Sequence, residues 1–161
     1  RRLFEKIILE GAQAGLSWIL ILRRRENYRA AFDGFDPAKI AAYDDADIER
    51  LVNDAGIIRN RAKIKSAINN ARAFIEHFGD DEDAFSHYLW SFVGGEPIIN
   101  HRERLKDIAV TTESSIQMSK SLKKLGFSFI GPTTCYALMQ AAGMVDDHFV
   151  TCFRHTNNRP K

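Results

Sequence analysis

The sequence is poor in cysteine and proline, with two cysteines and four prolines among 161 residues. Two thiols, Cys135 and Cys152, are too few for a disulfide-stapled scaffold or for an iron–sulfur cluster with four cysteine ligands. No apolar run is long enough to cross a bilayer, and the chain does not open with a secretory signal. We therefore expect a cytoplasmic protein, in a reducing compartment, without a membrane partner.

The sequence also lacks a long block of like charge. Its 23 basic and 21 acidic residues give a net charge of +2. Basic residues instead form clusters at Arg23 to Arg29, Arg59 to Lys65 and Lys120 to Lys124. Each cluster alone is typical of a solvated helix face. With 45% apolar residues, the chain can bury the core of a single domain covering residues 1–161. We expect a monomer.

Apolar residues recur at helical spacing along most of the chain, and no segment alternates as a strand would. The expected class is therefore all-α. The predicted helices cover about residues 2–13, 18–32, 37–43, 47–53, 61–78, 82–92, 102–108, 114–125, 132–142 and 145–153.

The turn between the helices expected at 114–125 and 132–142 has the pattern Gly-x-x-x-Ile-Gly, from Gly126 to Gly131. Gly126 suits a helix stop, and the proline after Gly131 suits the first turn of the next helix. The free N–H groups of Thr133 and Thr134 would then point toward an anion such as a phosphate. The pattern is typical of a helix-hairpin-helix DNA-binding element at about 114–143, but short glycine turns are also common structural connectors.

Glu10 and Trp18 flank a stretch of small residues. The helix macrodipole disfavours a carboxylate near the C-terminal end of a helix, where Glu10 is expected, and no lysine follows it at helical spacing. The ordinary interpretation is a solvent-facing glutamate and a core tryptophan.

His148 and Cys152 are four residues apart, so a helix would place both side chains on one face. Imidazole and thiolate can supply two ligands of a tetrahedral zinc ion, but two ligands do not complete a site. Cys135 fits the apolar stripe of its own helix and is expected in the core. Asp146 and Asp147 follow a glycine helix stop, where the usual role of an aspartate is helix capping.

Several blocks of the sequence together carry a family resemblance. They are Leu9 to Trp18, Arg25 to Arg29, Asp54 to Arg59, Trp90 to Phe92, Gly126 to Gly131, and Asp147-His148 with Cys152. In this order, over about residues 3–153, they resemble the constitutive bacterial 3-methyladenine DNA glycosylase I family. The resemblance implies a two-lobed helix-hairpin-helix glycosylase that binds double-stranded DNA containing an alkylated purine and flips the damaged base into a cleft.

By the family's pattern, Glu10 would hydrogen-bond the amino edge of the base and Trp18 would stack on its face. N3-alkylation makes the purine cationic, so a carboxylate and an indole favour it over neutral adenine. Gly126, Gly131, Thr133 and Thr134 would hold the DNA backbone.

Relatives that also cut the strand carry a lysine where this chain has Thr133, so the resemblance implies a monofunctional enzyme that leaves an abasic site. Many relatives place a catalytic aspartate near the position of Asp146, which could stabilise the sugar cation. The family also has an N-terminal segment with a cysteine and a histidine that complete a zinc site with the partners matching His148 and Cys152. Nothing precedes Arg1 here, so we expect zinc to be absent or incompletely held and the pocket to be open on one side.

Two other classes remain open from the residues alone: a non-catalytic helix-hairpin-helix DNA-binding module, and a helical interaction domain whose glycine turns only pack helices. Leu16, in the small-residue turn, is either a core leucine or the side chain that fills the gap left by a flipped nucleotide.

Overall fold

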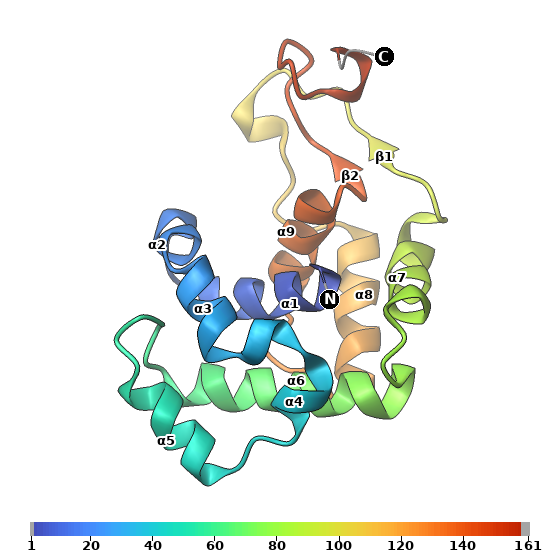
Figure 1. Ribbon diagram of the computed structural model, residues 1–161. Coiled ribbons are helices and arrows are strands. Elements are labelled where there is room, and N and C mark those ends of the chain that lie inside the picture. Colours follow the sequence, from blue (N-terminus) through green and yellow to red (C-terminus); the bar gives the residue numbers. More distant parts are fainter. Residues whose placement is uncertain (1, 159–161) are drawn as a thin grey trace.

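The computed structural model describes residues 2–158, most of which lie in helices (Figure 1). The long helix α6 (Arg61–Phe78) runs along the base, and α1 (Arg2–Gln13) crosses the middle of the molecule between α6 and α9 (Pro132–Ala142). The predicted all-α class is confirmed. The other helices are α2 (Trp18–Arg23), α3 (Arg25–Ala31), α4 (Pro37–Ala41), α5 (Asp45–Asn53), α7 (Glu82–Trp90) and α8 (Glu113–Lys124), with 3-10 turns at Asp33–Phe35, Ser91–Val93, Leu105–Asp107 and Thr156–Asn158.

The core forms around α1 and α6, because both carry apolar residues at helical spacing on the faces that meet. Phe4 of α1 packs on Phe74 of α6 with ring centroids 5.2 Å apart, and Phe74 packs edge-on against Phe85 of α7 at 5.0 Å. All three side chains are fully buried. This packing fixes α1, which carries Glu10, as the central element.

Capping residues mark the starts of α6 and α4. Asn60 accepts a hydrogen bond from the Lys63 N–H at the start of α6, and Asp36 caps α4, which opens with Pro37. Each such side chain satisfies a backbone donor that has no partner within the helix.

The single helix predicted for residues 18–32 is wrong. The chain forms α2 and α3 instead, separated at Arg24, whose backbone (φ −103°, ψ 2°) departs from helical geometry. Ser17 directly precedes α2, where a serine is expected to cap a helix, but its side chain makes no capping hydrogen bond. The helical pattern predicts that Leu22 packs inward, but 54% of its surface is exposed.

The helix predicted for 145–153 is also wrong. Val145–Asp146 forms a short strand, β2, that pairs in parallel with β1 (Ile98–Ile99). The N–H groups of Ile98 and Asn100 donate to carbonyls of residues 144 and 146, and that of Val150 donates to Arg102. Backbone groups that a helix would use internally are therefore satisfied by a segment far away in the sequence.

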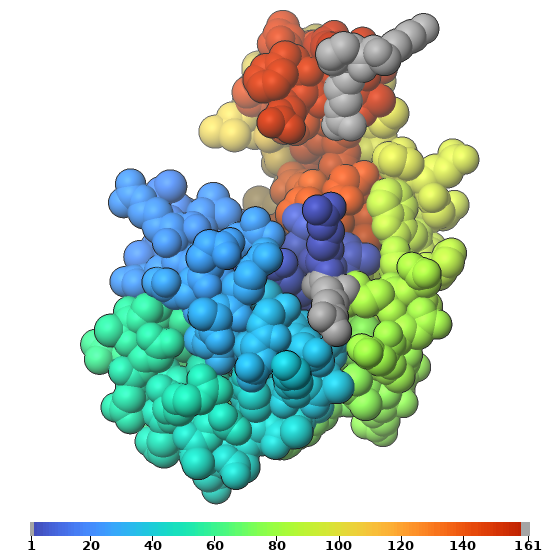
Figure 2. All heavy atoms as spheres, in the orientation of Figure 1, coloured from blue at the N-terminus to red at the C-terminus, as the bar shows by residue number. Residues whose placement is uncertain are grey.

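The two paired segments, 98–112 and 144–158, form a small lobe that projects above the helical body in Figures 1 and 2. Between residues 2 and 158 no helix is long and apolar enough to cross a membrane.

Candidate active site

Glu10 lies on the buried side of α1, with only 1% of its surface exposed. Its Oε2 atom is buried and has no hydrogen-bond partner among the described residues. Loss of water raises the pKa of Glu10 to about 7, against a smaller opposing effect of the Lys6 charge. A solvent-facing glutamate, the ordinary interpretation of the sequence, is excluded.

The turn after α1 brings Trp18 next to Glu10. Gly15 adopts a φ of +78°, which glycine accepts without steric cost, and so reverses the chain between α1 and α2. Lys63 of α6 donates to the carbonyls of Ala12 and Ala14 at 2.8 and 2.7 Å. Its charge offsets the negative end of the α1 macrodipole and fixes the turn that leads to Trp18.

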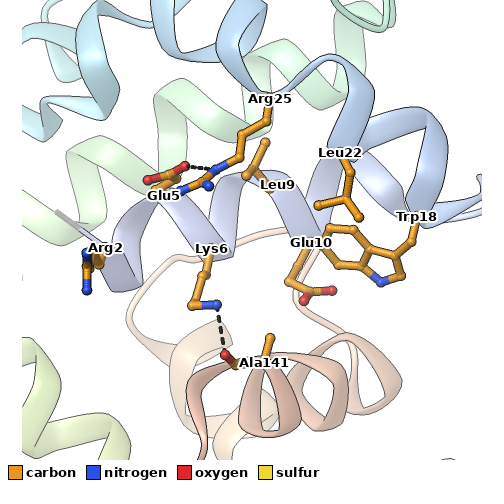
Figure 3. A pocket seen from close by; sticks show the side chains of 9 residues that line it. All are labelled: Arg2, Glu5, Lys6, Leu9, Glu10, Trp18, Leu22, Arg25 and Ala141. Atoms are coloured by element: carbon orange, nitrogen blue, oxygen red, sulfur yellow. Dashed lines mark hydrogen bonds and ion pairs between the residues drawn. The ribbon is translucent and has the colours of Figure 1, made fainter.

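Glu10 and Trp18 both line two adjoining hollows of about 520 and 400 Å³. Figure 3 shows the larger hollow, with the indole beside the carboxylate and Ala141 of α9 on the opposite wall. The smaller hollow continues toward Gln140 and His148. These volumes are sufficient for a purine-sized ligand. A carboxylate without an internal partner beside an aromatic face defines a site for a flat ring that carries positive charge or N–H donors.

The 125–131 turn joins α8 to α9 and is anchored to α6. Gly126, at a φ of +88°, ends α8, and its carbonyl accepts from Asn69. The Asn70 side chain accepts from the N–H of Ser128 at 2.8 Å and donates to its carbonyl at 3.1 Å, while Ser66 donates to the same carbonyl. The turn is therefore held in one conformation.

Beyond this anchor, five backbone N–H groups have no hydrogen-bond acceptor among the described residues: those of residues 129, 130, 131, 133 and 134. Three precede Pro132 and two lie in the first turn of α9, where the helix dipole is positive. A Cβ at Gly131 would meet no other atom within 4 Å, so the space beside it is open. Successive unpaired amides of this kind are able to bind an oxyanion.

Leu16, in the turn between Glu10 and Trp18, is half-buried and packs against the hydrophobic core. Cys135 is fully buried, as expected for a core residue.

The structure places Asp146 outside the lining of the two hollows. It lies in β2 and accepts hydrogen bonds from the N–H and hydroxyl of Thr156 and from the N–H of His148. Burial raises the pKa of Asp146, but these hydrogen bonds outweigh that effect and leave the pKa below its ordinary value. Asp146 is thus an ionised group that holds the last turn of the described chain.

Its neighbour Asp147 does line the smaller hollow, a role that the sequence did not suggest. It accepts from Asn100 and Arg102, each at 2.9 Å, from Gln140 at 2.8 Å, and from the Tyr136 hydroxyl. Two of these donors lie on α9, and the other two lie more than forty residues away in the segment after β1, so sequence spacing offered no signal for the complete network. Asp147 joins the small lobe to α9.

His148 and Cys152 approach each other although no helix joins them. The distance between His148 Nδ1 and Cys152 Sγ is 3.8 Å. Two ligands of a tetrahedral zinc ion at ordinary bond lengths stand about 3.6 Å apart, so the pair fits half of such a site. Within residues 2–158, no group of three or more histidine, cysteine or acidic side chains is arranged to hold a metal.

Known proteins resemble this chain along nearly all of its length. The methyladenine glycosylase family model matches residues 1–155. The DNA-3-methyladenine glycosylase 1 of Escherichia coli (strain K12) is 50% identical over 160 residues, which cover 99% of this chain and 85% of that protein. The DNA-3-methyladenine glycosylase of Haemophilus influenzae (strain ATCC 51907 / DSM 11121 / KW20 / Rd) is 50% identical over 154 residues, covering 94% and 82%.

Solved structures agree with these sequence matches. A crystal structure of 3-methyladenine DNA glycosylase I superposes with a TM-score of 0.93 at 50% identity, covering 96% of this chain and 85% of that chain. The Staphylococcus aureus enzyme, solved to explain 3-methyladenine recognition, gives 0.89 at 35% identity, with coverage of 100% and 83%.

The chain therefore belongs to the methyladenine glycosylase family. This confirms the resemblance seen in the sequence and the predicted class of enzyme, a glycosylase.

Proposed function

We propose that this protein removes 3-methyladenine from double-stranded DNA by hydrolysing its N-glycosidic bond, as the names of its relatives indicate for them. The observation that carries the proposal is the Glu10 Oε2 atom, buried without a partner in a pocket shared with Trp18. A core that served only stability would not keep a carboxylate in this state, because burial of an unpaired polar group costs free energy.

In the proposed complex the flipped base lies against the indole of Trp18, and its N–H edge donates to Glu10. N3-methylation gives the ring a positive charge, and both groups attract a cation more than a neutral ring. Normal adenine, being neutral, gains less from the same contacts. The charge of the methylated base therefore makes the pocket selective for it over normal adenine. Base flipping brings the base out of the duplex and into the pocket.

The chemical step needs little acid–base help. When the bond between N9 and C1′ breaks, its electron pair stays with the base, which leaves as neutral 3-methyladenine. The sugar becomes an oxocarbenium cation, and water adds to C1′ and loses a proton. Because the leaving group is already cationic, no residue has to protonate it, and the protein's main task is to hold the extruded base.

The unpaired amides around Gly131, with Thr133 and Thr134, are proposed to bind DNA phosphates, and the 113–142 region then serves as a helix-hairpin-helix element. Gly126 supports this role by ending α8 in the left-handed conformation. Thr133 has no amine with which to form a Schiff base, so the product is expected to be an intact strand with an abasic site. Because the pocket and the hairpin both lie on one chain, a single copy carries both sites, and we propose that the protein acts as a monomer. We also propose that it works in the cytoplasm.

A catalytic role for Asp146 remains a prediction. Its carboxylate is ionised, as support of a sugar cation requires, but its hydrogen bonds with Thr156 and His148 hold a turn outside the two hollows. An Asp146→Asn variant that excises base at an unchanged rate would remove it from the mechanism.

Zinc is proposed as a structural ion held in part by His148 and Cys152, whose separation fits two tetrahedral ligands. When bound, the ion would tie down the segment after β2, and no step of hydrolysis uses it. Metal content and thermal stability of Cys152→Ser, compared with the parent, test this role.

The function is tested by release of free 3-methyladenine from alkylated duplex DNA, after subtraction of spontaneous loss. Wild type should release base and Glu10→Gln should be strongly impaired, whereas Glu76→Gln, at an exposed position on α6, should match wild type. Lesion binding without any base release would instead indicate a non-catalytic DNA-binding module. Equal rates for wild type and Glu10→Gln would exclude the role given to Glu10.

A further inference from the structure

A lysine lines the same pocket in which we place a cationic base. Lys6 precedes Glu10 by four residues on α1, so the two side chains project from the same face of the helix. Both line the larger hollow, and Figure 3 shows Lys6 on the Glu10 side of it. A positive charge here opposes binding of a cationic ligand unless it serves another purpose.

The Lys6 side chain is held away from direct contact with Glu10. Its ammonium group donates to the Ala141 carbonyl at 2.8 Å. That carbonyl lies in the last turn of α9, where the helix dipole attracts a cation. No ion pair joins Lys6 to Glu10 in the described part of the chain, so Glu10 Oε2 stays available to a ligand while the Lys6 charge acts on it through space.

Most other charged groups around the two hollows have partners of their own. Glu5 pairs with Arg25 at 2.6 Å and with Arg29 at 3.5 Å. On the far wall, Asp147 pairs with Arg102, and His148 contacts Cys152.

Two further groups remain near the pocket. Arg2 lines the larger hollow two turns before Glu10. The Cys135 thiol is buried in α9, and burial raises its pKa against the opposing effects of Lys123 and Ser119. Lys6 is the cation whose charge lowers the pKa of Glu10.

We propose that Lys6 is a positioning residue that keeps the Glu10 carboxylate ionised inside the pocket and thereby sets the lower pH limit of base recognition. The inference depends on the proposed function, since it assumes that ionised Glu10 binds the cationic base. Without the lysine charge, burial acts on Glu10 unopposed, and a larger fraction of the enzyme carries a neutral carboxylic acid that attracts the cation less.

The test follows base release from alkylated duplex DNA against pH, comparing kcat/KM of wild type, Lys6→Met and Lys6→Arg. The matched control is Lys39→Met, which removes an exposed lysine on α4. Opposite charges one helical turn apart at a partly buried site interact strongly enough to move a pKa by about one unit. We therefore expect the acidic limb of the Lys6→Met profile to move up by about one pH unit, while Lys6→Arg and Lys39→Met follow wild type.

A readout independent of turnover is the NMR titration of the Glu10 side-chain carboxyl in the free protein, whose midpoint should rise in Lys6→Met. A merely structural role, such as the bridge to Ala141, would lower activity equally at all pH values. An active wild type with the same acidic limb and the same Glu10 midpoint in Lys6→Met would overturn the proposal for Lys6 alone. A wild type that releases no base at any pH would instead overturn the proposed function.

Discussion

Replacing Glu10 by glutamine should stabilise the folded protein at neutral pH while it impairs the enzyme. The substitution keeps the size of the side chain and removes its charge. Glu10 is 1% exposed, and its pKa is raised to about 7 in the folded state from an ordinary value of 4.5. The carboxyl group therefore binds its proton more tightly in the folded protein than in the unfolded chain.

The direction of the pH effect follows from this difference. Between pH 4.5 and about pH 7 the folded state carries more protons at Glu10, so its contribution to the free energy of unfolding falls as the pH rises. At about 1.4 kcal/mol per pKa unit, the fall amounts to about 3 kcal/mol and is complete above the folded pKa. Because glutamine does not titrate, the Glu10→Gln variant does not undergo this fall in the free energy of unfolding.

Glutamine has a cost of its own, because the buried position of Oε2 offers no hydrogen-bond partner. An unsatisfied amide costs about 1–3 kcal/mol, but this penalty does not depend on pH. The informative quantity is therefore the change with pH in the stability difference between Glu10→Gln and wild type, which should favour the variant by about 3 kcal/mol more at pH 8 than at pH 4.5.

Urea unfolding at a series of pH values measures this quantity, with Glu76→Gln as an exposed control that should show no such trend. Equal stability differences across the pH range would falsify the claim that burial raises the pKa of Glu10 in the folded protein. The same preparations give the activity comparison, so that a gain in stability and a loss of excision can be shown in one variant.

Three further predictions concern the pocket and the hairpin. Trp18→Leu should weaken binding of free 3-methyladenine roughly thirtyfold, measured by calorimetry, because stacking of a base on an aromatic ring contributes about 2 kcal/mol; unchanged affinity would place the base elsewhere. Asn70→Ala should lower the free energy of unfolding by about 2 kcal/mol in urea titrations, because the Ser128 N–H loses its acceptor, and should also weaken duplex binding in a fluorescence assay. Gly126→Ala should cost about 1 kcal/mol in thermal unfolding through its φ of +88°, since the added Cβ would meet Ala73 only at an ordinary 3.8 Å; a neutral result would show that the turn relaxes.

The bounds of α6 could be predicted from the sequence because local signals agree there: an apolar stripe at helical spacing, the capping residue Asn60 and the glycine stop Gly79. The helix α1 was predicted from its apolar stripe. The prediction failed at Arg24, where a continuous pattern hides a break, and after Gly143. There the partner of the backbone lies more than forty residues away, in β1, and no local pattern reports such pairing. The small lobe was therefore mispredicted although its aspartates and histidine had been singled out.

The candidate site was likewise predicted only in part from the sequence. Glu10 and Trp18 were named through the family resemblance, whereas their shared pocket depends on how α2 and α9 pack around α1. No lysine follows Glu10 at helical spacing, whereas Lys6 precedes it by four residues on the same face of α1. Asp147 was expected to cap a helix and Lys63 to lie on a solvated face. Their contacts with Arg102 and Ala12 were not predicted, because these partners lie in distant segments.

The helix α6 gives these separate parts a common frame. Near its start, Lys63 fixes the turn between Glu10 and Trp18, and one to two turns later Ser66 and Asn70 fix the hairpin through Ser128. The base pocket and the unpaired amides are thus attached to one rigid rod, with a rise of about 1.5 Å per residue between their anchors. A flipped nucleotide has to reach from a bound phosphate to the pocket, so a fixed distance between the two sites is what base extrusion requires. On this argument α6 matters to excision without contacting the base.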